Sequence, residues 1–423
     1  MDRRIAHVHA RQIFDSRGRP TVEVEVSTRG GCHGRASVPS GSSTGKYEAC
    51  ELRDDQDERY SGLGVFNAVR NVTETIAPQI IDLDVFDQRG IDNTLIDLDG
   101  TRDKSRLGSN ALLGVSLAVS RAACEHSQLP LYKYLGGLNS YSLPTPFINV
   151  INGGCHADNS LDFQEFMIVP TTQGTSFHQA IRHSAEVFYT LEKILKRDGL
   201  STNVGDEGGF APEIKNMEAV FRYLTEAVEK SGYQLGEDFG FALDVAASEL
   251  FRDGKYHLPG ESLVLSPEDM VNYLDQLAEK YPLVSIEDGL AQDDFSGFAR
   301  LVTMAKKHNH LQIVGDDLIV TDVMRLKKAI SQQSVTTVLI KPNQIGTLTE
   351  TLQCIHQAHR HGLKTMISHR SGETEDPYIA DLAVAVRSGQ ITTGSLSRGE
   401  RTLKYNQLLR IEEDLSLQGC FGL

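Results

Sequence analysis

Six short apolar segments in the second part of the chain each end on a polar residue that could take part in chemistry. At intervals of 23–43 residues, these end residues are Asp244, Glu287, Asp316, Lys341, His369 and Thr392. Three carboxylates held close together repel one another unless a cation lies among them, and hard oxygen ligands in an octahedral shell suit Mg²⁺. We therefore predict that Asp244, Glu287 and Asp316 are metal ligands.

The lysine at the fourth segment end suggests proton transfer. Lys341 would lie beside the bound cation, whose positive charge lowers the pKa of the ammonium group and suits it to be a general base. A glycine-rich loop, "VGDEGGF" at 204–210, carries Glu207 as a candidate general acid. Together these groups could remove a proton next to a carboxylate while the metal stabilises the resulting dianion.

Two further loops have compositions suited to an anionic ligand. The stretch "SHRSGETED" at 368–376 offers Arg370, Ser371 and backbone amides for a phosphate dianion. The stretch "SVPSGSSTGKYEA" at 37–49 is rich in small residues, as expected of a lid that closes over an anion and expels water. Each loop could also be a surface turn, and a single carboxylate after a strand is commonly a helix cap. Five ionisable ends in succession favour a site.

The apolar segments themselves indicate the architecture. They alternate with helical patterns, as in a parallel sheet that is buried on both faces. The segments are 239–244, 282–287, 311–316, 336–341, 363–369 and 389–394. In a closed α/β barrel the carboxyl ends of the strands meet at one mouth, so the six end residues would converge on one cavity.

The first part of the chain has a different pattern. The stretch "TVEVEV" at 21–26 alternates valine with glutamate, which predicts a half-buried antiparallel strand. Helical patterns follow at 65–80 and 109–127, and the second opens on a Ser/Asn cap. We expect an α+β domain over residues 1–135 that carries the lid, followed by a barrel domain over residues 136–423.

Composition argues against several other classes of protein. With 423 residues, of which 40% are hydrophobic, the chain can form a barrel and a smaller domain. A net charge of −15 without a basic run disfavours nucleic acid as a partner, and no apolar stretch is long enough to predict a membrane span. The six cysteines are scattered, as in a reduced cytoplasmic protein.

Other motifs do not point to a different chemistry. The signatures of zinc proteases, serine hydrolases and P-loop enzymes are absent from the sequence. The histidine-rich stretch "HQAHRH" at 356–361 could chelate a metal, but its helical setting favours a solvated helix face.

Several stretches resemble the signature sequences of the enolase family, the phosphopyruvate hydratases of glycolysis. They include "DSRGRPTVEVEV", "PSGSSTGKYEA", "VGDEGGFAP", "SIEDGL", "VGDDLIVT", "IKPNQIGTLTET", "SHRSGETED" and "KYNQLLRIEE", in the family's order along essentially the whole chain. The resemblance implies an N-terminal α+β domain followed by an atypical eight-stranded α/β barrel. It also implies two Mg²⁺ ions, the second bound with substrate, and interconversion of 2-phosphoglycerate and phosphoenolpyruvate.

Carried over position by position, the resemblance assigns roles to the site residues. The metal ligands that it implies are Asp244, Glu287 and Asp316 for the first Mg²⁺ and Ser43 for the second. Lys341 corresponds to the family base, and Glu207 to the acid that protonates the departing hydroxyl, with Glu165 and His156 assisting. Positions that correspond to substrate-binding residues are Gln164, His369, Arg370 and Ser371. The resemblance further implies a homodimer or an octamer of dimers, in which Glu23 faces Arg410 of a neighbouring subunit.

Thr392 departs from this pattern. The family has a lysine here, in "QIKTG", that contacts the substrate carboxylate, whereas a threonine hydroxyl is shorter and carries no charge. Two activities therefore remain open: a Mg²⁺-dependent lyase acting on 2-phosphoglycerate, or a paralogue with another phospho-carboxylate substrate, similar to carboxyphosphonoenolpyruvate synthase of phosphonate biosynthesis. A binding protein without catalysis is a third hypothesis, against which the retained Lys341, Glu207 and three carboxylates argue.

Overall fold

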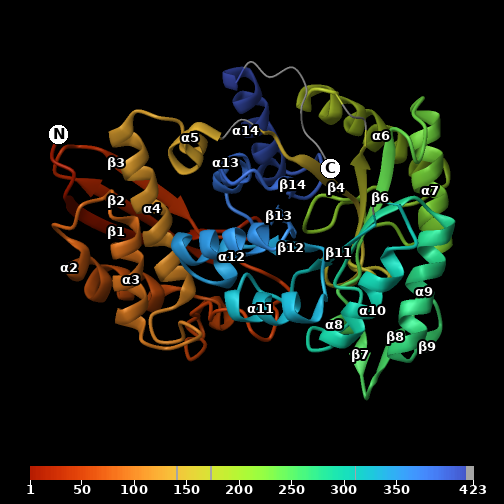
Figure 1. Cartoon of the computed structure of the whole chain (residues 1–423), viewed down its shortest axis with the longest axis horizontal. Helices are drawn as coiled ribbons and strands as arrows, with labels where there is room; N and C mark the ends of the chain where they lie inside the picture. The colour runs from red at the N-terminus through yellow and green to blue at the C-terminus, as the bar shows by residue number, and fades with distance from the viewer. Residues whose placement is uncertain (140–141, 172–173, 310, 416–423) are drawn as a thin grey trace.

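The computed structural model describes residues 1–139, 142–171, 174–309 and 311–415. Figure 1 shows an N-terminal part, coloured red to orange, beside a larger part coloured yellow to blue. The N-terminal part combines a small sheet with helices, and the larger part is a closed eight-stranded barrel with helices around it. This is the fold class predicted from the sequence.

A three-stranded antiparallel sheet begins the chain. In their spatial order, its strands are β1 (Ile5–Phe14), β2 (Pro20–Thr28) and β3 (His33–Ser37). On β2, Val22, Val24 and Val26 are fully buried, whereas Glu23 and Glu25 lie on the opposite, partly exposed face. The alternation in "TVEVEV" therefore predicted both the strand and its buried face correctly.

Helical elements of the N-terminal part follow the sheet. They are η1 (Arg59–Gly62), α1 (Phe66–Arg70), the π-helical η2 (Asn71–Ile76), α2 (Ala77–Ile80), α3 (Gln88–Asp99), α4 (Ser109–Ser127), α5 (Leu131–Gly136) and η3 (Gly137–Asn139). Helix α4 packs so closely on β3 that a Cβ at Gly34 would lie 2.0 Å from the carbonyl oxygen of Ala118. Both predicted helical regions are present, and the boundary at residue 135 stays a prediction.

The expected Ser/Asn cap of α4 is wrong. The N-cap residue is Gly108, and no side chain caps the helix. Ser109 and Asn110 are instead buried in the first turn, because α4 is covered on almost all sides. The Asn110 side chain accepts a hydrogen bond from the backbone N–H of Leu52, at 3.2 Å, and so ties the lid region to the helix.

Eight strands close the barrel. Around the barrel they are β10 (Leu283–Glu287), β11 (Gln312–Gly315), β12 (Thr337–Ile340), β13 (Lys364–Ser368), β14 (Gly389–Thr392), β4 (Thr145–Asn152), β5 (Glu165–Pro170) and β6 (Phe239–Asp244). All six apolar segments predicted as strands are strands of this barrel. Pairing is parallel from β6 through β10 to β14 and β4.

Strand β5 runs against its neighbours. It pairs antiparallel with both β4 and β6. An entirely parallel sheet, as the apolar segments alone suggested, is therefore the wrong description of this part of the barrel. The atypical barrel implied by the enolase resemblance is the correct one. The reversal brings the start of β5 to the barrel mouth, where Glu165 pairs in register with Asp244.

Helices surround the barrel, and a small sheet lies beside it. These elements are η4 (Gly154–His156), α6 (Phe177–Arg197), α7 (Met217–Lys230), α8 (Ala247–Leu250), β7 (Phe251–Arg252), β8 (Lys255–Leu258), β9 (Leu263–Leu265), α9 (Pro267–Lys280), α10 (Phe295–Ala305), α11 (Val323–Gln332), η5 (Pro342–Gln344), α12 (Leu348–Arg360), α13 (Tyr378–Ala385) and α14 (Gly399–Leu415). His356, His359 and His361 are exposed at the end of α12, as predicted. Among the described residues, no helix has both the length and the apolar character needed to cross a membrane.

Ion pairs join the N-terminal helices to the barrel. Arg121 of α4 donates to both carboxylate oxygens of Asp376, with one contact at 2.7 Å. Lys104, which precedes α4, lies 2.8 Å from Glu350 of α12. These buried contacts set the N-terminal part against the barrel, so that the 37–49 loop reaches the mouth.

Candidate active site

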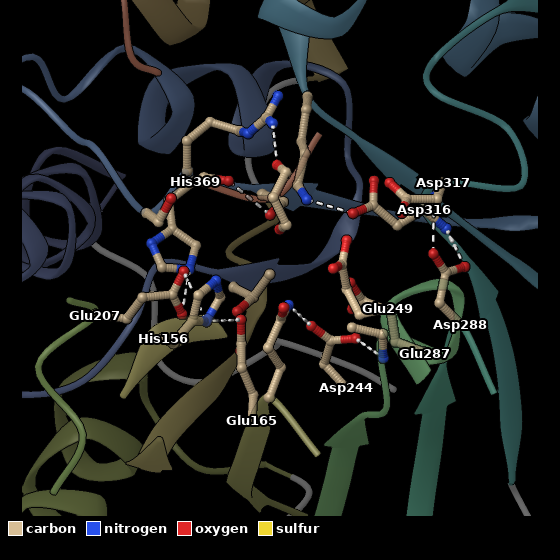
Figure 2. Close-up of a pocket in the computed structure, with 18 residues that line it drawn as sticks. His156, Glu165, Glu207, Asp244, Glu249, Glu287, Asp288, Asp316, Asp317 and His369 are labelled. Atoms are coloured by element: carbon tan, nitrogen blue, oxygen red, sulfur yellow. Dashed lines mark hydrogen bonds and ion pairs between the residues drawn. The ribbon is translucent and has the colours of Figure 1, made fainter. Parts of the chain in front are cut away.

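All residues predicted to belong to the site line one cavity at the barrel mouth. They are Ser43, His156, Gln164, Glu165, Glu207, Asp244, Glu287, Asp316, Lys341, His369, Arg370, Ser371 and Thr392. The strand ends converge because the carboxyl ends of parallel strands lie at the same end of the barrel. Figure 2 shows two groups in this cavity: His156, Glu165, Glu207 and His369 on one side, and the aspartates on the other.

The expected metal ligands occupy the second group. Burial raises the pKa of Asp244 to about 7. Burial and the neighbouring carboxylates of Asp244 and Asp316 raise the pKa of Glu287 well above its usual range. Buried carboxylates whose ionised forms are this costly fit a hard divalent cation, which would compensate their charge.

Two of the three expected ligands accept hydrogen bonds from neighbouring side chains. Asp244 accepts from the side-chain amide of Gln164 at 3.0 Å, and Asp316 accepts from the Lys341 ammonium. Among the described residues, one acidic group whose ligand atoms lie within 4.8 Å of one another contains Asp288, Asp316 and Asp317. Asp244 and Glu287 lie outside this group, and their role as ligands of the same cation stays a prediction.

Asp288 and Asp317 were missed in the sequence. Asp288 accepts from the backbone N–H groups of Asp316, at 3.0 Å, and Asp317, at 2.8 Å. It thereby orients the turn that carries Asp316. Burial and the charge of Asp316 raise the pKa of Asp317 to about 8. The signal was present, because both "SIEDGL" and "VGDDLI" carry a second acidic residue after the strand end.

The pKa of Lys341 is raised by its neighbours within the chain. Burial alone would lower it, but the Asp316 carboxylate, which accepts a hydrogen bond from the ammonium, outweighs burial and raises the pKa above its usual value. Within the chain the close partner of Lys341 is the Asp316 carboxylate, which favours the ammonium form. The lowered pKa expected beside a bound cation stays a prediction.

The first group contains two carboxyls with opposite tendencies. Burial and the negative charge of Glu207 raise the pKa of Glu165 well above its usual range. Burial would also raise the pKa of Glu207, but His156 and His369 outweigh it and hold the pKa well below that range. Of the two, Glu165 is therefore the carboxyl that more readily holds a proton, and Glu207 the one that more readily ionises.

The neighbours of Glu207 explain its anionic state. His156 Nδ1 lies 3.6 Å from both Glu165 and Glu207, and His369 Nε2 lies 3.4 Å from Glu207. The side-chain amide of Asn149, on β4, donates to Glu207 at 3.0 Å. The sequence offered no signal for Asn149, which comes from the middle of an apolar strand.

The lid lies against the predicted phosphate site. Arg370 donates to Glu48 of the lid at 2.9 and 3.1 Å, and to the carbonyl oxygen of Ser43 at 3.1 Å. The backbone N–H of Ser42 donates to the Ser371 hydroxyl at 2.6 Å. A Cβ at Gly41 would lie 2.0 Å from an Arg370 nitrogen, so only glycine permits this approach. Both residues predicted to hold phosphate thus hold the lid.

Thr392 ends β14 with its hydroxyl in the cavity lining. It is 3% exposed, and its Oγ1 has no hydrogen-bond partner. Among the described residues, Lys341 and Arg370 are the only lysine and arginine side chains that line the cavity. Carboxylates greatly outnumber them, and Glu249 adds another that the sequence reasoning missed. The Thr392 end therefore offers a ligand a neutral polar group and no cation.

The fold and the cavity define a class of protein: barrel enzymes whose ionisable residues gather at the carboxyl ends of the strands. Two family models match the chain, "Enolase, N-terminal domain" over residues 5–135 and "Enolase, C-terminal TIM barrel domain" over residues 140–422. The chain therefore belongs to the enolase family, and this membership supports a lyase of the enolase superfamily. Neither match favours the paralogue with an altered substrate.

Proposed function

We propose that this chain is a Mg²⁺-dependent lyase that interconverts 2-phosphoglycerate and phosphoenolpyruvate. The observation that carries the proposal is the presence, in one buried cavity, of a lysine set among carboxylates and of a glutamate pair whose pKa values are shifted in opposite directions. Dehydration of a hydroxy acid needs a base for the carbon-bound proton and an acid for the departing hydroxyl. The two groups supply these two functions.

The base in this proposal is Lys341. It can accept a proton from the substrate once Asp316 is engaged in the metal site, since the carboxylate that raises its pKa is then neutralised. Mg²⁺ held by Asp244, Glu287 and Asp316, with Ser43 serving a second ion, would stabilise the negative charge that develops on the substrate carboxylate.

The acid is the Glu165–Glu207 pair. Glu165 holds the proton, and Glu207 lies between His156 and His369, so a proton can reach the departing hydroxyl through either carboxyl. In the family pattern Glu207 is the immediate donor. Because the pKa of Glu207 is held low, Glu207 would first have to receive a proton. Glu165, whose pKa is raised, is the neighbouring source.

Arg370 and Ser371 would bind the substrate phosphate, and the lid would exclude water. A guanidinium recognises phosphate through charge-assisted hydrogen bonds. The 37–49 loop contacts both of these residues, so a bound phosphate would lie against the loop. Closure of the loop over the cavity would then accompany phosphate binding.

Steady-state kinetics tests this function directly. With Mg²⁺ and 2-phosphoglycerate, we expect phosphoenolpyruvate to form, followed by its absorbance, and we expect chelation of the metal to stop the reaction. A folded protein that binds Mg²⁺ yet gives no phosphoenolpyruvate would contradict the proposal.

We also propose that the chain forms a homodimer, with Arg410 as an interface residue. Within the chain, Glu23 is already paired with Arg11 at 2.6 Å and accepts from the Ser37 hydroxyl at 2.9 Å, so replacing it would disturb its own domain. Arg410 is exposed and has only a 3.5 Å contact with Gln407. Arg410→Glu is therefore the cleaner variant: light scattering should show a shift toward monomer, and an unchanged mass at low micromolar concentration would oppose this interface.

A further inference from the structure

A buried arginine beside the active site was not among the predicted site residues. Arg401 belongs to the first turn of α14 and is fully buried. It does not line the cavity, yet it contacts the two loops that carry site residues on the acid side. A buried guanidinium is costly unless its hydrogen bonds are satisfied, so its partners are informative.

The terminal nitrogens of Arg401 have four acceptors. Nη1 donates to Nδ1 of His369, at 2.6 Å, and to the carbonyl oxygen of Arg370. Nη2 donates to the carbonyl oxygen of Asp206, at 2.9 Å, and to that of Ser371. These four bonds account for all four Nη–H groups. One side chain thus connects the loop before Glu207 with the segment 369–371.

The contact with His369 determines where the imidazole carries its proton. A guanidinium has donors and no acceptor, so Nδ1 of His369 must accept and has no hydrogen. A neutral imidazole then carries its hydrogen on Nε2, and this nitrogen lies 3.4 Å from Glu207 Oε2. Burial lowers the pKa of His369, and the charge of Arg401 lowers it further, which favours the neutral ring.

We propose that Arg401 is a positioning residue that holds His369 as the neutral, Nε2-protonated tautomer, so that His369 donates its ring N–H to the Glu207 carboxylate. The Nε2–H of His369 then faces Glu207 Oε2 at 3.4 Å, beside the Asn149 side-chain amide that donates to Glu207 at 3.0 Å, and both favour the Glu207 carboxylate. The catalytic importance of this arrangement rests on the proposed function. The tautomer itself does not.

The glycine at position 394 leaves room for the Arg401 side chain. Gly394 follows β14 with a φ of +77°, and a Cβ there would lie 2.8 Å from Cδ of Arg401 and 2.7 Å from the carbonyl oxygen of Glu207. The hydroxyl of Tyr405, one turn along α14, donates to the carbonyl oxygen of Gly394 at 2.7 Å. The loop after β14 is thus shaped around the guanidinium and the backbone of Glu207.

Nitrogen NMR of the intact protein tests the tautomer without substrate. In full-length protein labelled with ¹⁵N-histidine, the His369 signals, assigned by their loss in His369→Asn, should show a protonated Nε2 and an unprotonated Nδ1. A protonated Nδ1 in the wild type would overturn the proposal. This measurement decides the question even if every Arg401 variant fails to fold.

Three variants then test the cause. Arg401→Met removes the donor, so the His369 signals should move toward the Nδ1-protonated or a mixed form, whereas Arg401→Lys, which keeps a charged donor, should preserve more of the Nε2-protonated form. Arg398→Met is the matched control, because Arg398 bonds to the Ser16 carbonyl and to Glu400, which also lies 3.4 Å from Arg401 Nε, and not to His369. An unchanged tautomer in folded Arg401→Met would overturn the assignment.

Kinetics separates positioning from a merely structural role. If the proposed function holds, Arg401→Met should lower kcat by about 10–100-fold, as loss of an outer-shell partner commonly does, with KM little changed, and Arg401→Lys should recover part of it. Equal loss of kcat in the two variants despite different tautomers would contradict positioning. Absence of turnover in the wild type would contradict the proposed function while the NMR result would still stand.

Discussion

The two ends of the barrel interior are built by the same strands yet have opposite chemistry. On β11 the inward-facing row reads Gln312, Val314 and Asp316, and on β12 it reads Thr337, Leu339 and Lys341. On these two strands the side chains are neutral at the amino ends, which we call the floor, and ionisable at the carboxyl ends, which we call the mouth. On each of these strands, the polar residue of the floor therefore lies four positions before the ionisable residue of the mouth that can take part in chemistry.

An apolar layer insulates the mouth from the floor. It consists of Phe147, Met167, Val169, Ala242, Val284, Val314, Leu339 and Met366. On the floor Gln312 accepts from Thr337, at 2.7 Å, and from Gln390, at 3.0 Å. At the mouth, polar atoms such as Oγ1 of Thr392 and Oε1 of Gln164 have no hydrogen-bond partner among the residues that the structure describes. On the floor Gln312 and its two donors bond to one another, although Oε1 of Gln390 has no partner among the described residues, whereas several polar atoms at the mouth are left for a ligand.

The largest effect should come from removing the base at the mouth. Lys341→Met should lower kcat/KM for 2-phosphoglycerate by about 10³–10⁴-fold, near the upper range for general acid–base catalysis. Steady-state kinetics measures this loss. Lys104→Met is a matched control, because it removes another buried lysine from its carboxylate, Glu350, without touching the cavity. Turnover by Lys341→Met equal to that of the control would refute the role of Lys341.

A second prediction adds charge where the mouth has none. Thr392→Lys places a cation at the end of the cavity where the substrate carboxylate is expected, so kcat/KM for 2-phosphoglycerate should rise by about 10–10³-fold, the worth of one preorganised contact. Thr392→Met is the control, since it fills similar space without charge. A gain no larger than that of Thr392→Met would mean that the cavity is shaped for another ligand.

A third prediction concerns the metal ligands. Asp316→Asn removes one anionic ligand and should weaken Mg²⁺ binding in the substrate-bound complex by about 10–100-fold or more, since even outer-shell partners are worth that much. Calorimetric titration measures the affinity, and circular dichroism checks that the fold survives. Asp275→Asn, at a surface pair with Lys307, is the control. Unchanged affinity in Asp316→Asn would remove this residue from the ligand set.

Much of the mouth could be predicted from the sequence because it follows a local rule. Each buried strand is recognisable as an apolar run, and the residue that breaks the run, such as Asp316 or Lys341, is the one that reaches the mouth. The doubled acids Asp288 and Asp317 follow the same rule and were readable. The small residues of the 37–49 loop predicted a lid, which stays a prediction, and the contact of this loop through Glu48 left no signal in the sequence.

Other features depend on distant pairing and leave no local trace. The antiparallel direction of β5 is set by its neighbours in the barrel, and its apolar sequence is compatible with either direction. Arg401 lies in a charged helical stretch, and three of its four partners are backbone carbonyls, which any residue supplies. The pKa of Lys341 depends on which charge is nearest, and a sequence does not state whether that charge is Asp316 or a metal ion.

The smallest effects on activity are expected on the floor. Two matched variants there compare the loss of an acceptor shared by two donors with the loss of one donor. Gln312→Leu removes the acceptor shared by Thr337 and Gln390, which leaves two buried donors without a partner, at a cost of about 1–3 kcal/mol for each group. Gln390→Leu removes one donor and an oxygen that already has no partner, so its cost should be below about 1 kcal/mol. Urea denaturation measures both values. Neither variant should change kcat/KM, because the apolar layer separates the floor from the cavity. Equal destabilisation would mean that the hydrogen bonds of Gln312 contribute little, and altered turnover would mean that the two ends of the barrel are coupled.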